Sequence, residues 1–329
     1  MSEAGDYTPG WVGHDFDSAR KDYRQHARTS LNVAVQKGVI VKDLVPESLY
    51  TESSNPTVVI YDQTGSMDEW PGVMFAKAVF FDHECRTEYR GEDVEYSWSA
   101  IGDAHNRERY PFQARNFTKG QSIESSLKEI VSERDGGGQT YETYEYAALY
   151  YARNVEMPNA INPLLIFIGD ESPYETIEPD LAKHLTHIEL KKTMRTSDAF
   201  KELKQKFTVY LIQKPYGSGT LTDGELTGTT KRVHDDWAKL VGEDHVVLLG
   251  DPNRVMDTIL GIMAHEAGKT GEFTKELTDR QTPAQVKTVM TSLKTIHALP
   301  KGGVSQRRLL GAGKSVTRRS KKNKKEDDE

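Results

Sequence analysis

Three oxygen-bearing side chains come directly after a short apolar stretch in the first quarter of the chain. Residues 57–61 are all β-branched or aromatic, and Asp62, Thr64 and Ser66 follow at once. An unbroken run of this kind is typical of a central parallel strand that is covered on both faces. Ligands of open α/β sheets bind beyond the carboxyl ends of such strands. Because carboxylate and hydroxyl oxygens are the hard ligands that Mg²⁺ prefers, the loop after residue 61 is a candidate metal site.

Two further segments are expected to bring donors to the same edge of the sheet. Residues 136–138 are all glycine, which permits close approach of the backbone to a ligand, and Thr140 follows just before an expected helix. The apolar stretch 164–168 is the second strand to finish on an acid, since Asp170 comes after Gly169. We therefore expect Thr140 and Asp170 to complete the site begun by the first loop.

The elements that must position these residues alternate between apolar runs and helical stripes. Over residues 55–266 this alternation predicts a single domain with a doubly wound, mostly parallel α/β sheet and helices on both faces. Strands are expected at 57–62, 94–100, 110–117, 164–168, 207–212 and 246–249, the third of them as a short edge strand. Helices are expected near 17–36, 71–80, 122–134, 144–151, 179–205, 232–240, 252–266 and 282–298.

With these features in this order, the chain resembles the von Willebrand factor type A (VWA) domain with its metal-ion-dependent adhesion site. That site has the pattern Asp-x-Ser/Thr-x-Ser on a first loop, a Thr on a second and an Asp on a third. Carried over residue by residue, the pattern falls on Asp62, Thr64, Ser66, Thr140 and Asp170. The resemblance covers roughly residues 53–266 and implies a Rossmann-like VWA fold with one antiparallel edge strand.

The resemblance also implies a function. Such a site holds Mg²⁺, with Mn²⁺ or Ca²⁺ as alternatives, and the incompletely neutralised cation takes an Asp or Glu from a partner protein. The chain is therefore expected to be a non-enzymatic, intracellular adaptor or scaffold, and in related cellular proteins the partner is often an AAA+ ATPase of the MoxR type. Glu171 stands where many family members have Gly. An extra carboxylate there would reduce the demand of the cation for an external acid.

Simpler explanations exist for several of these residues. Asp62 and Asp170 could merely cap the helices that follow them. Asp68 and Glu69 could form a second cation site, although acids at the start of a helix explain them better, and Asp103 is interpreted as part of a polar turn after the second strand. A metal-dependent hydrolase is a further alternative, but the sequence offers no general base for a nucleophile.

Composition favours a soluble protein in a reducing, cytoplasmic compartment. The chain has 329 residues, 28% of them charged, a single cysteine, Cys85, and no secretory signal pattern at its start. It has no apolar stretch near the roughly 20 residues that a membrane span needs, so no membrane association is expected. From this pattern we expect an N-terminal arm and helical extension at 1–52, the VWA domain at 53–266, a C-terminal helix at 267–300 and a disordered tail at 301–329.

Charge is distributed unevenly along the chain. The net charge is −7, yet residues 301–325 contain ten Lys or Arg and no acid, and 326–329 are all acidic. An alternative function follows from this tail, because a basic segment attracts nucleic acid or another polyanion. A VWA protein associated with nucleic acid through residues 301–325 is therefore the second functional hypothesis.

Overall fold

The computed structural model describes residues 15–67, 69–106, 108–133, 140–216 and 226–297, all of which belong to the unit Met1–Leu299. Asp68, the three glycines at 136–138 and the basic segment 301–325 lie outside the described residues, so the predictions that concern them stay predictions.

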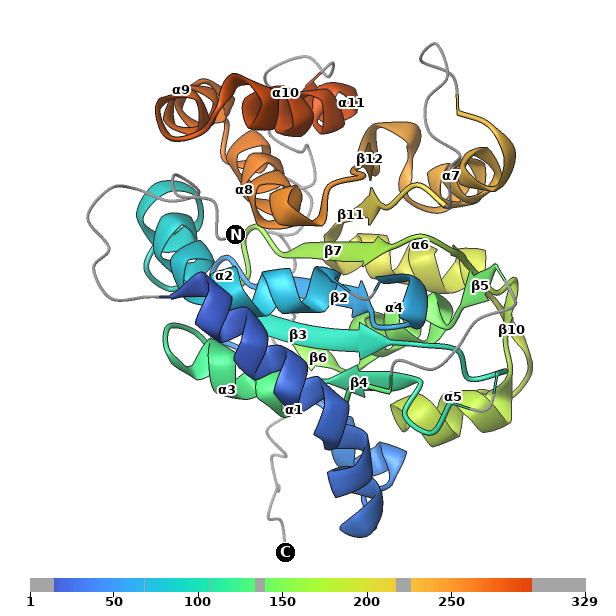
Figure 1. Ribbon diagram of the computed structural model, residues 1–329. Helices are drawn as coiled ribbons and strands as arrows, with labels where there is room; N and C mark the ends of the chain where they lie inside the picture. The colour runs from blue at the N-terminus through green and yellow to red at the C-terminus, as the bar shows by residue number, and fades with distance from the viewer. Residues whose placement is uncertain (1–14, 68, 107, 134–139, 217–225, 298–329) are drawn as a thin grey trace, which may run out of the picture. The chain divides into compact units, whose positions relative to one another are not determined.

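A six-stranded sheet forms the centre of this unit (Figure 1). In spatial order its strands are β12 (Val246–Leu248), β11 (Thr208–Gln213), β7 (Leu164–Gly169), β2 (Thr57–Asp62), β3 (Tyr96–Ile101) and β4 (Phe112–Ala114). All neighbours are parallel except β4, which runs antiparallel to β3. The sheet class and the reversed edge strand predicted from the sequence are thus confirmed.

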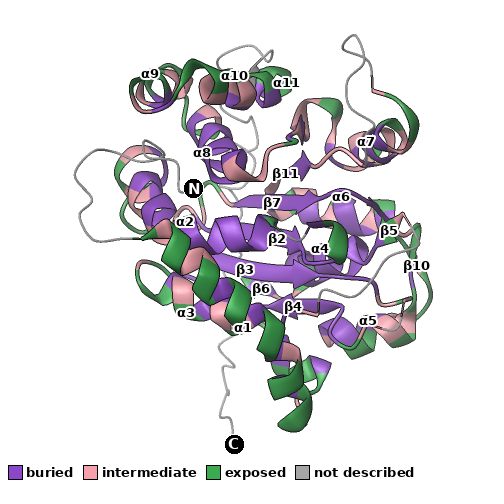
Figure 2. Cartoon of the chain, in the orientation of Figure 1, coloured by how far each residue is buried: buried purple, intermediate pink, exposed green. Residues whose placement is uncertain are grey.

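The central strands are buried on both faces, as their unbroken apolar sequences predict. Every residue of β2, β3 and β7 is buried, and β2 pairs with β3 on one side and with β7 on the other (Figure 2). Tyr61 is paired with Ile168 near the ends of β2 and β7. Since these two strands are parallel neighbours, their carboxyl ends and the loops that follow lie side by side.

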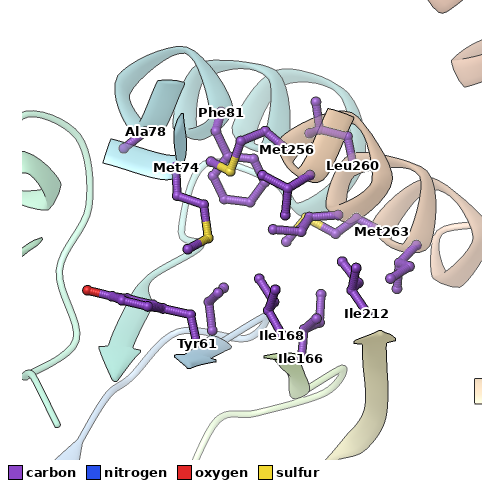
Figure 3. Close-up of a cluster of buried hydrophobic side chains, with 14 of the residues drawn as sticks. Tyr61, Met74, Ala78, Phe81, Ile166, Ile168, Ile212, Met256, Leu260 and Met263 are labelled. Atoms are coloured by element: carbon purple, nitrogen blue, oxygen red, sulfur yellow. The ribbon is translucent and has the colours of Figure 1, made fainter. Parts of the chain in front are cut away.

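One face of the sheet is covered by α2 (Trp70–Glu84) and α8 (Val255–Glu266). Figure 3 shows Met74 and Phe81 of α2 and Met263 of α8 above Ile166 and Ile212 of the sheet. The same apolar cluster includes residues from α1 (Phe16–Gln36), α3 (Ser122–Lys128), α9 (Thr270–Arg280), α10 (Pro283–Ser292) and α11 (Lys294–His297). Helix α1 keeps an exposed outer face (Figure 2), as its stripe of apolar residues four apart predicts.

The opposite face is covered by α4 (Tyr144–Arg153), α6 (Thr196–Lys206) and α7 (Gly228–Val241). Aromatic rings dominate this layer, since Trp237 of α7 contacts Tyr144, Phe167 and Phe200 with ring centroids 4.9 to 5.6 Å apart. A further helix, α5 (Pro179–Thr186), packs against α4 through a separate cluster that contains Ala182 and Leu185.

Three helix predictions differ from the structure. The segment 179–205 forms two helices, because α5 ends at His187 in the left-handed conformation with φ 60° and the chain resumes a helix only at α6. The segment 282–298 is likewise divided into α10 and α11. Helix α9 lies within the segment 267–300, for which one C-terminal helix was expected; it was not predicted as a separate helix, since only Phe273 and Leu277 in it are buried.

Short elements complete the unit. Three two-stranded pairs join β1 (Leu49–Tyr50) to β6 (Val155–Glu156), β5 (Tyr141–Glu142) to β8 (Ser172–Pro173) and β9 (Thr176–Ile177) to β10 (Met194–Arg195). Helix α2 continues into a π-helical turn, Cys85–Arg90. None of the described helices is both long and apolar enough to cross a membrane.

Both edge strands of the large sheet have partners that are not strands. At β4, the side-chain amide of Gln113 donates to the Val131 carbonyl at 2.7 Å and accepts from the Val131 amide at 2.8 Å. At β12, the Val246 carbonyl accepts a hydrogen bond of 3.1 Å from the hydroxyl of Thr295 in α11. Each edge strand is only three residues long.

Candidate metal centre

The first loop presents its donors beyond the end of β2. Asp62 is fully buried, and its Oδ1 accepts a hydrogen bond of 2.7 Å from the Thr64 amide, which fixes the turn. A 3-10 turn, Gly65–Met67, follows, and the hydroxyls of Thr64 and Ser66 lie 3.2 Å apart. Ser66 is exposed. The loop therefore joins a buried carboxylate to an exposed serine.

The third loop meets the first. Asp170, only 1% exposed, follows β7, and its Oδ1 accepts a hydrogen bond of 2.9 Å from the Ser66 hydroxyl. The parallel pairing of β2 and β7 explains this contact, because it sets the two strand ends next to each other. Four of the five predicted residues, namely Asp62, Thr64, Ser66 and Asp170, are thus linked in one chain of hydrogen bonds.

Thr140 is placed beside the third loop by its backbone. Its carbonyl accepts a hydrogen bond of 3.3 Å from the Ser172 amide, and the next residue, Tyr141, is paired with Ser172 in the β5–β8 ladder. Across the described ranges, no hydrogen bond joins the Thr140 side chain to the other four residues. A complete five-residue metal site therefore stays a prediction.

A lysine that the sequence analysis did not single out lies between the two loops. Lys214 follows β11 directly, and its Nζ donates to Asp170 Oδ2 at 2.7 Å and to the Ser66 carbonyl at 2.8 Å. Its backbone amide donates to the Gly169 carbonyl at 2.9 Å. Like Asp62, Lys214 lies at the carboxyl end of an apolar run, but its contacts with the first and third loops depend on the adjacency of β7 and β11.

Acids outnumber this lysine at the same edge of the sheet. Glu142, Glu171 and Asp103 are buried, with exposures of 3%, 5% and 2%. Burial, with Asp170 as the next cause, raises the pKa of Asp62 to about 8. The same two causes raise the pKa of Glu171 to about 7, and burial together with Asp62 raises that of Glu142 to about 12. These shifts describe carboxylates that are buried close to one another.

The acids from the loop after β3 belong to this edge as well. Asp103 is more than a polar turn residue, since its Oδ1 accepts hydrogen bonds from the Tyr174 hydroxyl at 3.0 Å and the His105 amide at 2.8 Å. Glu108 folds over Gly102, where a Cβ would lie 1.7 Å from Glu108 Oε2. Burial raises the pKa of Glu108 to about 8. A side chain at position 102 would therefore displace the Glu108 carboxylate from this place.

The helix-capping explanation of the two aspartates is not supported by the structure. The residue that caps α2 is Glu69, and the residue that caps α5 is Glu178, so neither Asp62 nor Asp170 lies at a helix start. Glu69 itself is explained as a helix-start acid, whereas the second cation site proposed with Asp68 lies partly outside the described residues.

The donor chemistry fits a hard divalent cation. All five predicted side chains carry oxygen, and two of them, Asp62 and Asp170, are buried acids. Among the residues that the structure describes, no three His, Cys, Asp or Glu side chains converge as a metal cluster. A cation here would therefore rely on the hydroxyls and on water in addition to the carboxylates, as Mg²⁺ often does. Glu142 Oε2 is buried without a hydrogen-bond partner, which shows that the acids are not satisfied among themselves.

Comparison with known proteins gives similarity at the level of structure. No protein-family model matches the chain, and no curated protein matches it in sequence. Among solved structures, the chain is similar to the pilus adhesin SpaC from Lactobacillus rhamnosus GG, at 10% identity and a TM-score of 0.44 over 71% of this chain and 32% of that chain. The open conformation of SpaC gives a TM-score of 0.43 at 10% identity, over 71% of this chain and 31% of that one.

A second similar structure is that of proximal thread matrix protein 1 from the mussel byssus. It matches at 11% identity and a TM-score of 0.38, over 65% of this chain and 48% of that chain. The chain thus spans about a third of SpaC and about half of the byssus protein. The α/β arrangement of this chain, a mostly parallel six-stranded sheet with one antiparallel edge strand, is given by its own strand pairing.

Proposed function

We propose that this chain is a non-enzymatic protein-interaction module that binds a partner carboxylate through a divalent cation. The cation, Mg²⁺ or alternatively Mn²⁺ or Ca²⁺, would be held by Asp62, Thr64, Ser66, Thr140 and Asp170. One observation carries the proposal: the hydroxyl of Ser66 in the first loop donates to the carboxylate of Asp170 in the third loop at 2.9 Å. The two loops that the VWA resemblance assigns to one site therefore meet.

The acidic and the hydroxyl side chains would make different contributions to the binding of the cation. Asp62 and Asp170 would supply negative charge from buried positions, where the low dielectric strengthens attraction to a cation. The hydroxyls of Thr64 and Ser66 would supply neutral oxygen, and the exposure of Ser66 leaves the site open on the solvent side. When bound, the cation would supply a position for an external Asp or Glu. The partner that the resemblance suggests is an AAA+ ATPase of the MoxR type.

Calorimetric titration with Mg²⁺ and Mn²⁺ tests the site assignment. The wild type is compared with an Asp62→Ala, Asp170→Ala double variant, and an Asp198→Ala, Asp235→Ala double variant is the matched control. The control removes the same charge from two side chains that are each 46% exposed and form ion pairs with Arg195 and Lys231. Loss of metal binding in the first variant alone is expected. If both double variants bind metal as the wild type does, with thermal unfolding showing that each is folded, the assignment is wrong.

A capture experiment tests the partner. The immobilised chain is incubated with purified candidate ATPase in Mg²⁺ and again in chelator. We expect the ATPase to be lost in chelator and not to bind the Asp62→Ala, Asp170→Ala variant. Binding of the ATPase that survives both changes would contradict a metal-dependent interaction.

A further inference from the structure

Lys214 lies within the proposed site, although the five-residue pattern includes no cation. Its Nζ contacts Asp170 Oδ2 at 2.7 Å and the Ser66 carbonyl at 2.8 Å. The Lys214 side chain is 23% exposed and that of Asp170 is 1% exposed, so this ion pair is largely withdrawn from water. An ion pair in such a position is screened far less than one on the surface.

The backbone holds the lysine in place. The Lys214 amide donates to the Gly169 carbonyl at 2.9 Å, directly at the end of the neighbouring strand β7. The ammonium group therefore connects the first loop, the third loop and the end of β11. It contacts one oxygen of Asp170, while the other oxygen of Asp170 accepts from Ser66.

We propose that Lys214 is a built-in counter-cation that sets the metal affinity of the site, because it neutralises Asp170 in the absence of metal and repels the divalent ion. This inference rests on the proposed function and concerns a residue that the five-residue pattern does not contain. Two buried acids, Asp62 and Asp170, would otherwise face each other with no positive charge between the loops. The positive charge of Lys214 stabilises the metal-free site. The same charge weakens the binding of the divalent metal ion.

The charged groups around Lys214 agree with this role. Glu171 lies next to Asp170; burial and Asp170 raise its pKa to about 7, and the charge of Lys214 opposes that rise. Arg232 contacts the Thr140 carbonyl at 3.4 Å and is paired with Asp236, so its charge is already balanced. Among the described residues, Lys214 is thus the one basic residue that forms a hydrogen bond with the side chain of a predicted metal ligand, Asp170.

Calorimetry with Mg²⁺ alone and Mn²⁺ alone tests the proposal on the full chain. In a Lys214→Met variant we expect the metal to bind at least about tenfold more tightly, since a unit charge close to a divalent ion has been removed. A Lys214→Arg variant keeps the charge and should bind metal like the wild type. A Lys231→Met variant is the control, because it removes the same charge from an exposed residue that pairs with Asp235.

Thermal unfolding gives a second test, because Lys214→Met should bind metal more tightly but be less stable than the wild type when no metal is present. In chelator, Lys214→Met should unfold at a lower temperature than the wild type, since Asp170 has lost its counter-ion. Addition of Mg²⁺ should then raise the unfolding temperature of the variant by more than it raises that of the wild type.

The outcomes separate this inference from the proposed function. Equal or weaker metal binding by folded Lys214→Met would overturn the role of the lysine, even if Asp62→Ala still abolishes binding. Unchanged metal binding by Asp62→Ala would instead show that the site assignment has failed. Tighter binding by Lys214→Met, restored to the wild-type value by Lys214→Arg, would support the proposal.

Discussion

The two ends of the central sheet both bury charge, but they balance it in different ways. At the amino end, Arg90 of the π-helical turn is 5% exposed, and its Nη2 donates to the carbonyls of Asn55, Pro56 and Asn162, which precede β2 and β7. At the carboxyl end, buried acids predominate among the described residues, and Lys214 bonds to one of them, Asp170.

The comparison suggests that buried charge has a structural role at the amino end of the sheet and a binding role at the carboxyl end. At the amino end, neutral carbonyls accept hydrogen bonds from the Arg90 guanidinium, whose Nε is buried without a partner, so the buried charge there is positive. The carboxyl end has a surplus of carboxylates, with the pKa values of Asp62, Glu108 and Glu171 raised to between about 7 and about 8. A cation would relieve that surplus, which agrees with a site at this end alone.

Removal of the guanidinium at the amino end should give the largest loss of stability. Arg90→Met removes a buried donor shared by three carbonyls, of which the Pro56 carbonyl keeps the Leu164 amide, and we expect the free energy of unfolding to fall by about 3 kcal/mol. Metal affinity should not change, because Arg90 lies at the far end of the strands. Urea unfolding and calorimetry measure the two quantities.

The control for that variant is Arg195→Met. Arg195 forms an exposed ion pair with Asp198, so its loss should cost less than about 1 kcal/mol. If Arg90→Met lowered the free energy of unfolding no more than this control, or if it altered metal binding, the proposed difference between the two ends of the sheet would be wrong.

A rise in pH should destabilise the metal-free protein through its carboxyl end. The pKa of Asp62 rises from its ordinary value of 3.8 to about 8 in the folded protein. Between these values the folded chain retains a proton that the unfolded chain has released, so the free energy of unfolding falls as the pH rises. We expect a fall of about 2 kcal/mol between roughly pH 5 and pH 8, measured by urea unfolding in chelator.

Saturating Mg²⁺ should reverse this trend, because the cation binds the deprotonated carboxylate and its affinity therefore rises with pH. Stability in chelator that stays level or increases over the same interval would show that the buried acids are already balanced by charge within the protein.

The smallest effect is expected from one acid that is not a predicted ligand. The pKa of Glu142 rises from 4.5 to about 12, so the wild type must keep this group protonated when folded at neutral pH. Glu142→Gln removes that requirement and can still donate to Glu171. The metal-free variant should be about 1 kcal/mol more stable than the wild type near pH 8 and closer to it near pH 5.

Glu243→Gln is a suitable control for Glu142→Gln, because the Glu243 side chain is 73% exposed. A Glu142→Gln protein that is less stable than the wild type at both pH values would indicate that the carboxyl group makes a favourable contact instead.

The sequence was sufficient for the sheet and for the loops after β2 and β7. Continuous β-branched and aromatic runs identify buried parallel strands, and an acid directly after such a run identifies the site edge, as Asp62 and Asp170 illustrate. Helix α9 was harder to predict, because Phe273 and Leu277 are its only buried side chains and pattern methods depend on longer stripes.

Residues whose role depends on contacts between distant segments were not predictable. Lys214 is 44 residues from Asp170 in sequence, and only the adjacency of β7 and β11 brings them together. Glu108 owes its place to the missing side chain of Gly102, which no local pattern reveals. The two helices within 179–205 depend on the backbone turn at His187, a conformation that is uncommon outside glycine.

The covered edges of the sheet limit how this chain can associate with others. A free strand edge offers unpaired amides and carbonyls on which another chain can add a strand, and this is a common route to aggregation and to fibres. Here Gln113 occupies the backbone groups of Val131 at one edge, and Thr295 occupies a carbonyl of β12 at the other. Each edge strand is also only three residues long, so an added strand could pair with few backbone groups on either side.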